Sequence, residues 1–276
     1  MPASALIAVL AAALLHASWN LVLKSSSERL VAASAQVALG GIAFVPILVW
    51  RGFPTEVLPF LLASAVVEVG YIFALATAYD RADLSFVYPI ARGSAPVLIA
   101  AGAFLGLSDR VTGLGWVALA LICGGVLTIG LSAPTRRGAQ WSLVTGFLIA
   151  TYVTIDGAGV RRTSDALAYT AALFLLTATL LIPFALLMRG RTVVGLALKA
   201  EWKRQLLAGV ASLGSYSLLL YASKSAPLSL VSAARESGVL FATLLGWWFL
   251  DERVIRLRLA AAALIALGVV LLALSR

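Results

Sequence analysis

The chain has 276 residues, of which 62% are hydrophobic and 12% are charged, against roughly 45 to 50% and 25% in soluble domains. A membrane span takes about 20 residues, so this length holds roughly ten spans and leaves no room for a soluble domain. A cytosolic enzyme and a secreted disulfide module are excluded, and the single Cys123 excludes an intrachain disulfide. The net charge of +9 would favour nucleic acid in a soluble protein. In a membrane protein such an excess records topology, so we expect no nucleic-acid partner.

Ten apolar stretches are long enough to form membrane helices, and short connections with Gly, Pro and Arg separate them. The first stretch is predicted to be a retained helix rather than a signal peptide, because no basic residue precedes it and Lys24 follows it. The predicted spans are residues 3–23, 30–50, 57–79, 83–107, 111–131, 141–160, 166–188, 205–223, 228–250 and 255–275.

The basic residues predict the orientation of the chain. The odd-numbered loops hold 13 Lys and Arg, whereas the even-numbered loops and the termini hold 6. Short loops with more positive charge stay in the cytoplasm, so we expect both termini on the outer side of the inner (plasma) membrane. The alternative is a miscount of spans, which would invert everything after the error.

The two remaining basic residues, Arg92 and Arg235, lie inside predicted spans and belong to an internal repeat. Residues 82–87 match 226–231, and 91–94 match 234–237; further along, Asp109-Arg110 pairs with Glu252-Arg253 and Gly125-Val126 with Gly268-Val269. The sequence therefore predicts two repeats, 1–132 and 139–276, of five spans each. An odd number of spans forces the second repeat to enter the membrane inverted. Inverted repeats are typical of secondary transporters, whose substrate site lies near the midplane between the repeats and whose mechanism is alternating access.

Two motifs resemble a known family. The first span contains HASWN at 16–20 with Lys24 at its end, the fourth contains YPIARGSAPV at 88–97, and an acidic residue closes spans four and nine. This pattern is similar to the drug/metabolite transporter (DMT) superfamily, and within it to the EamA-type ten-span exporters, which include YddG-like amino acid exporters. The resemblance covers nearly the whole chain, and it implies an all-α membrane protein with a central cavity. The second copy departs from the pattern, with Ser232 and Ala233 in place of Tyr88 and Pro89.

The intramembrane charges are the first candidates for substrate binding. An ionised side chain near the bilayer centre costs about 2.5 to 3.5 kcal/mol, so each needs a partner, water or a ligand. Glu68 and Arg92 fall at similar depth on neighbouring spans. They form either a structural ion pair or a site in which Arg92 binds the carboxylate and Glu68 the amine of a zwitterion.

The adjacent Arg235 and Glu236 cannot face each other well, so each needs a partner elsewhere. We expect Arg235 to lie across the pseudo-two-fold axis from Arg92, and Glu236 is a candidate proton carrier. Pairing of Arg235 with Glu68, or of Glu236 with another span, is the structural alternative.

Further polar and aromatic residues are expected to line the cavity. His16 and Asn20 share one helix face, as do Tyr152 and Asp156 in the sixth span, although Asp156 could instead lie at the outer interface. The other candidates are Trp19, Tyr71, Tyr88 and Tyr216, for which ordinary packing is the alternative. Pro89 and Pro96 remove backbone hydrogen bonds from the fourth span, which makes that span the candidate gate.

Together these features predict a secondary transporter that exports amino acids or related small metabolites, with possible coupling to protons. Its partners would be the lipid bilayer and a zwitterionic or anionic small molecule, and the carrier is expected to work as a monomer. No phosphate-binding loop and no metal-ligand cluster is found in the sequence, so we expect no cofactor, no metal and no enzyme activity. A carrier for drugs, cations or sugar nucleotides is the alternative, and an intramembrane enzyme using His16 is a weaker one.

Overall fold

The computed structural model describes residues 1–81, 84–107, 111–131, 139–238, 241 and 256–274, and this part of the chain is helical with no strand. The all-α prediction is confirmed. The elements are α1 (Ala3–Lys24), α2 (Arg29–Ala43), α3 (Val45–Arg51), the short 3-10 helix η1 (Thr55–Val57), α4 (Leu58–Arg81), α5 (Leu84–Leu107), α6 (Gly113–Leu131), α7 (Ala139–Val160), α8 (Ala166–Ser223), α9 (Leu228–Arg235) and α11 (Arg256–Leu274).

Several of these helices have the length and apolar character of membrane spans. Within the described ranges, five qualify: Ala3–Leu23, Arg29–Arg51, Thr55–Leu75, Gln140–Val160 and Ala166–Ser223. Shorter apolar helices follow at Ile90–Gly102 and Gly113–Thr128. That the chain has ten spans therefore stays a prediction.

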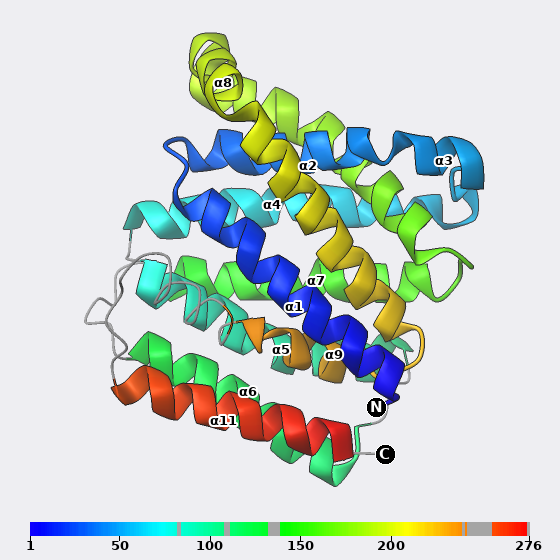
Figure 1. Ribbon diagram of the computed structural model, residues 1–276, viewed down its shortest axis with the longest axis vertical. Helices are drawn as coiled ribbons and strands as arrows, with labels where there is room; N and C mark the ends of the chain where they lie inside the picture. The colour runs from blue at the N-terminus through cyan, green and yellow to red at the C-terminus, as the bar shows by residue number, and fades with distance from the viewer. Residues whose placement is uncertain (82–83, 108–110, 132–138, 239–240, 242–255, 275–276) are drawn as a thin grey trace.

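The longest element, α8, contains two helices joined at a glycine. Its 58 residues would extend about 87 Å as one straight helix, far beyond the roughly 30 Å of a bilayer core. Gly190 interrupts it with φ 78° and ψ 155°, a conformation open to glycine. Figure 1 shows the two parts running in opposite directions from this point. The loop expected between the predicted spans 166–188 and 205–223 is thus wrong in detail, because residues 191–204, which include Val, Leu, Ala and Lys, extend the second helix back to the break.

The second predicted span likewise consists of two helices. α2 ends at Ala43, and α3 begins one residue later, after Phe44. Pro46 lies in the first turn of α3, where its missing N–H breaks no hydrogen bond of the new helix but prevents continuation of the old one.

Glycines allow the closest helix contacts. At the extensive interface of α2 and α8, a Cβ atom on Gly209 would lie 2.3 Å from the carbonyl oxygen of Gln36. Between α6 and α11, a Cβ on Gly125 would lie 2.9 Å from the Ala261 oxygen, and one on Gly268 would lie 2.9 Å from the Ala118 oxygen. Both interfaces require glycine because the backbones touch.

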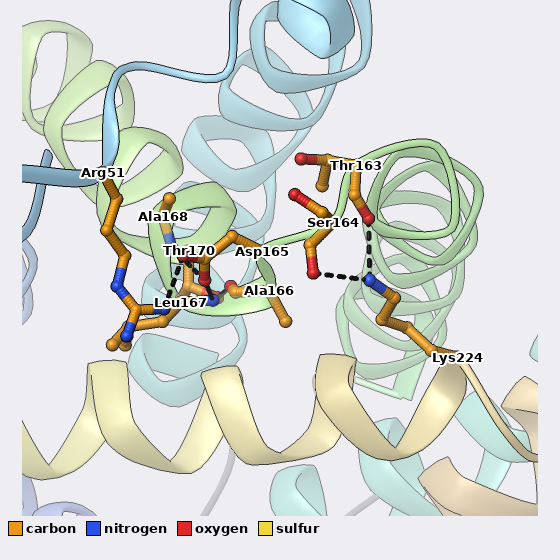
Figure 2. A network of polar contacts seen from close by, with 9 residues as sticks. All are labelled: Arg51, Thr163, Ser164, Asp165, Ala166, Leu167, Ala168, Thr170 and Lys224. Atoms are coloured by element: carbon orange, nitrogen blue, oxygen red, sulfur yellow. Dashed lines mark hydrogen bonds and ion pairs between the residues drawn. The ribbon is translucent and has the colours of Figure 1, made fainter.

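Polar contacts fasten one end of the bundle, and Figure 2 shows them. Asp165 begins α8 by accepting hydrogen bonds from the amides of Leu167 (2.9 Å) and Ala168 (3.1 Å). Its other oxygen lies 2.6 Å from Nη1 of Arg51, the last residue of α3. Partial burial by itself raises the pKa of Asp165, but the hydrogen bonds from Arg51 and the two amides outweigh it and hold the pKa below its ordinary value.

A lysine joins the next connection to the same end. The ammonium group of Lys224, after α8, donates to the carbonyl oxygens of Thr163 (2.7 Å) and Ser164 (2.9 Å) (Figure 2). Arg161 donates to the carbonyl of Ser223 at 2.9 Å. These basic side chains therefore bind the protein's own backbone, and the site with buried charges lies elsewhere.

Candidate functional site

A buried ion pair lies where α1, α5 and α9 meet. Nη1 of Arg92, on α5, is 3.6 Å from Oε1 of Glu236, which follows α9 directly, and the two side chains are only 7% and 4% exposed. The other Nη of Arg92 forms a hydrogen bond with Nε2 of His16 on α1. A guanidinium can only donate, so Nε2 accepts and the imidazole is neutral. Arg92 thus connects segments from both ends of the sequence.

The ion pair of Glu68 with Arg92 is not formed, and that expectation is corrected. Glu68, on α4, instead accepts a hydrogen bond from the hydroxyl of Thr177 on α8 at 2.7 Å. The structural alternative for Glu236, pairing with another span, is what the structure has. Depth along two helices did not determine the partners, because the distance also depends on which way each helix face is turned.

Arg235 is the second buried cation. The residue is 3% exposed, and its Nε has no hydrogen-bond partner in the described part of the chain. Its positive charge acts on His16 together with that of Arg92, which places both guanidinium groups near that ring. Glu236, the next residue along the chain, is directed to Arg92. This cluster therefore has two guanidinium groups and one carboxylate.

The first-span motif supplies one aromatic side of the cluster. The rings of His16 and Trp19 meet edge to face with centroids 4.9 Å apart, and Nε1 of Trp19 is buried without a hydrogen-bond partner among the described atoms. The amide of Asn20 donates to the His16 carbonyl at 2.8 Å. Asn20 was expected to line the cavity, but its side-chain amide is bonded to its own helix.

Three tyrosines from different helices form a connected aromatic row. The centroids of Tyr71 (α4) and Tyr152 (α7) are 5.5 Å apart, and those of Tyr152 and Tyr216 (α8) are 6.2 Å apart. The charges of Arg235, Arg92 and Glu68 all act on Tyr152, so its ring lies within electrostatic range of the two arginines and of Glu68. The structure brings these predicted residues together.

An acidic pocket adjoins the row. Asp156, fully buried on α7, accepts hydrogen bonds from the phenol groups of Tyr169 (2.9 Å) and Tyr216 (2.5 Å). The Asp156 side chain is buried and faces α8, while its position at the outer interface stays an alternative, because Asp156 lies one turn before the end of α7. Tyr169 and Thr177 were not identified from the sequence. A tyrosine and a threonine within an apolar span were the available signal, but many such residues only pack.

The proposed gating residues remain predictions. Tyr88 and Pro89 lie in α5, and their side chains fall outside what the structure describes. Pro96 is buried, and the helix runs through it without interruption. Across the described ranges, no group of three or more His, Cys, Asp and Glu residues could hold a metal.

Comparison with known proteins identifies the family. The sequence profile described as "EamA-like transporter family" matches residues 136–274. The chain belongs to the EamA-like transporter family. Membership makes it a DMT-type transporter, which acts on a small molecule in a lipid bilayer, and so it agrees with the apolar helices.

A solved structure supports the fold of this EamA-like transporter over its whole length. The chain is similar to one described as "Crystal structure of protein", with a TM-score of 0.78 and 18% identity, over 99% of this chain and 98% of the other. At that identity the likeness shows the fold alone. No curated protein matches the sequence.

Proposed function

We propose that this EamA-like transporter is a secondary carrier that exports amino acids or related small metabolites across the inner membrane by alternating access. The supporting observation is the buried cluster of Arg92, Arg235 and Glu236, in which positive charge exceeds negative charge. Such an excess inside a bilayer protein is costly unless an anionic group neutralises it. A substrate carboxylate supplies that group.

Arg235 is the proposed receptor for the carboxylate. Arg92 already has Glu236 and His16 as partners, whereas Nε of Arg235 has no partner within the described residues. A guanidinium binds a carboxylate through two parallel hydrogen bonds, which suits this task. This assignment moves the main role from Arg92, the sequence-based candidate, to its counterpart in the second repeat.

The aromatic row and Glu68 complete the proposed recognition of a zwitterion. The charges of the two arginines and of Glu68 all act on Tyr152, so a substrate on its ring would have both cations and a carboxyl within electrostatic range. The neighbouring Tyr71 and Tyr216 offer apolar ring surface to the substrate's side chain. A cationic drug would find repulsion at the two arginines, which favours amino acids over that alternative.

The inverted repeat, 1–132 and 139–276, is part of the same proposal. The helix contacts support it: α1 packs on α9 as α7 packs on α5, and α1 packs on α8 as α7 packs on α4. The contact of Gly125 with Ala261 is matched by that of Gly268 with Ala118, at the same sequence spacing. Two similar halves can exchange conformations, which is the basis of alternating access.

Counterflow in proteoliposomes tests the function. Proteoliposomes that contain the purified full-length protein and are loaded with unlabelled amino acids should take up the radiolabelled amino acids saturably. The corresponding decarboxylated amines should not exchange. Nucleotide sugars and cationic drugs form parallel arms of the panel, and exchange of either class instead would replace the amino acid assignment. Absence of flux with every compound would remove the carrier function.

Variants test the site. We expect Arg235→Gln to abolish amino acid counterflow and Arg235→Lys to raise KM, because a lysine keeps the charge but loses the bidentate geometry. The matched control is Arg191→Gln, which removes an exposed arginine and should leave counterflow unchanged. Unchanged counterflow in folded Arg235→Gln would reject the assignment of the carboxylate receptor.

A further inference from the structure

Asp156 has an environment that the substrate site does not explain. It is fully buried in α7, and no ion pair with a Lys, Arg or His is formed by it among the described residues. A buried carboxylate without a cation is strongly unfavourable unless it is hydrogen bonded or protonated. Its two phenol partners, Tyr169 and Tyr216, both come from α8.

A second carboxyl group adds to the negative charge of this pocket. The charge of Asp156 acts on Glu68 of the packed helix α4. The ionisable groups that face the pocket are Glu68 from α4 and the two tyrosines from α8, while Arg92 of α5 is paired with Glu236. Two nearby carboxylates without a cation repel each other, and the uptake of one proton relieves the repulsion.

The hydroxyl of Ser64 is a third polar group at the Asp156 carboxyl. Ser64 is fully buried on α4, and its hydroxyl interacts with the Asp156 carboxylate, although among the described residues its Oγ forms no hydrogen bond of ordinary geometry. Buried serines and threonines in helices usually donate to the carbonyl four residues earlier, as Ser34 and Thr170 do here. Ser64 does not, so its hydroxyl can turn to the carboxyl, where it donates to the ionised form or accepts from the protonated form.

The pocket therefore provides partners for both forms of the carboxyl group. An ionised Asp156 only accepts hydrogen bonds, and the two phenols donate them. A protonated Asp156 becomes a donor and needs an acceptor, which the Ser64 oxygen supplies.

We propose that Asp156 is the proton-binding residue of this transporter and that substrate export is exchanged for proton entry there. The inference rests on the proposed carrier function. In the exchange, a proton from the outer side binds a carboxylate oxygen of Asp156 and is released to the cytoplasm when substrate is carried outward. Tyr216 connects the two sites, since its hydroxyl contacts Asp156 and its ring contacts Tyr152. Glu236, the sequence-based candidate for this role, is bound to Arg92.

Asp156→Asn separates proton coupling from substrate exchange. In proteoliposomes we expect this variant to retain counterflow without a gradient, to lose accumulation driven by a pH gradient, and to lose the substrate-induced pH change reported by an entrapped dye. Accumulation on a pH gradient by Asp156→Asn would overturn the proposal. Loss of counterflow by the folded variant would also overturn it, because the residue would then serve the fold or the substrate.

Ser64→Ala is the second variant, and it tests proton binding at Asp156 if Asp156→Asn does not fold. The Ser64 hydroxyl favours the ionised carboxylate by donating to it, so without it the pH midpoint of gradient-driven transport should rise by about 0.5 to 1 unit. Thr177→Ala, which removes the hydroxyl bonded to Glu68, is the matched control for loss of a buried hydroxyl next to the other carboxyl. An unchanged midpoint in Ser64→Ala would reject the site. Wild-type counterflow without proton movement overturns the proton proposal alone, whereas wild-type protein without any counterflow removes the carrier function and this proposal together.

Discussion

Replacement of Glu236 by Gln should destabilise the fold far more than replacement of Glu68 by Gln. Glu236 is the carboxylate 3.6 Å from Arg92, and both side chains are almost fully buried. Removal of one partner of a buried ion pair costs about 3 to 5 kcal/mol. We expect the lower end, because His16 also contacts Arg92 and remains. About 3 kcal/mol corresponds to roughly two powers of ten in the folding equilibrium.

The Glu68→Gln variant keeps an oxygen that can accept the hydrogen bond of Thr177, and it removes a negative charge near Asp156. Its cost should therefore stay below about 1 kcal/mol. The two substitutions have the same chemistry, so the comparison isolates the ion pair.

The assay is reversible unfolding of detergent-solubilised protein by a denaturing detergent, in a double-mutant cycle with Arg92→Gln. The double variant of Arg92 and Glu236 should recover about 1 to 3 kcal/mol relative to the sum of the single variants. If the destabilisation of the double variant equals the sum of those of the two single variants, the ion pair is refuted. A larger cost for Glu68→Gln than for Glu236→Gln would refute the assignment of partners.

Three further predictions concern the periphery and the packing. Asp165→Ala, which removes the α8 cap and an ion pair, should cost about 1 to 2 kcal/mol at neutral pH. Because the pKa of Asp165 is lowered by folding, its contribution is present above about pH 3.9 and lost as pH falls through the folded value; equal cost at pH 7 and below pH 3 would contradict this. Gly268→Leu should lower the free energy of unfolding by about 1 to 3 kcal/mol through overpacking. Gly113→Ala should leave it unchanged, because there is open space around Gly113. In a Cys123→Ala background, Arg136→Cys should resist labelling from outside, and ready labelling would invert the predicted topology.

The positions of the helices could be predicted because membrane spans need long apolar runs, and composition displays them directly. The breaks inside them were less visible. Gly190 divides α8 where basic residues suggested a loop, and the helix-forming residues around it concealed a single change of φ. Phe44 separates α2 from α3 within one apolar run.

The sequence alone determined that the protein is a membrane-embedded helical bundle of the EamA type with two buried arginines, since hydropathy, charge and motif are properties of the chain itself. Only the tertiary structure decided the partners of those charges. Arg92 binds Glu236 and His16, Glu68 binds Thr177, and Asp156 binds two tyrosines of α8. Apart from Asp156 and Tyr169, which are 13 residues apart, these partners are distant in sequence. Their pairing depends on the rotation of each helix about its axis, which packing of the whole bundle fixes.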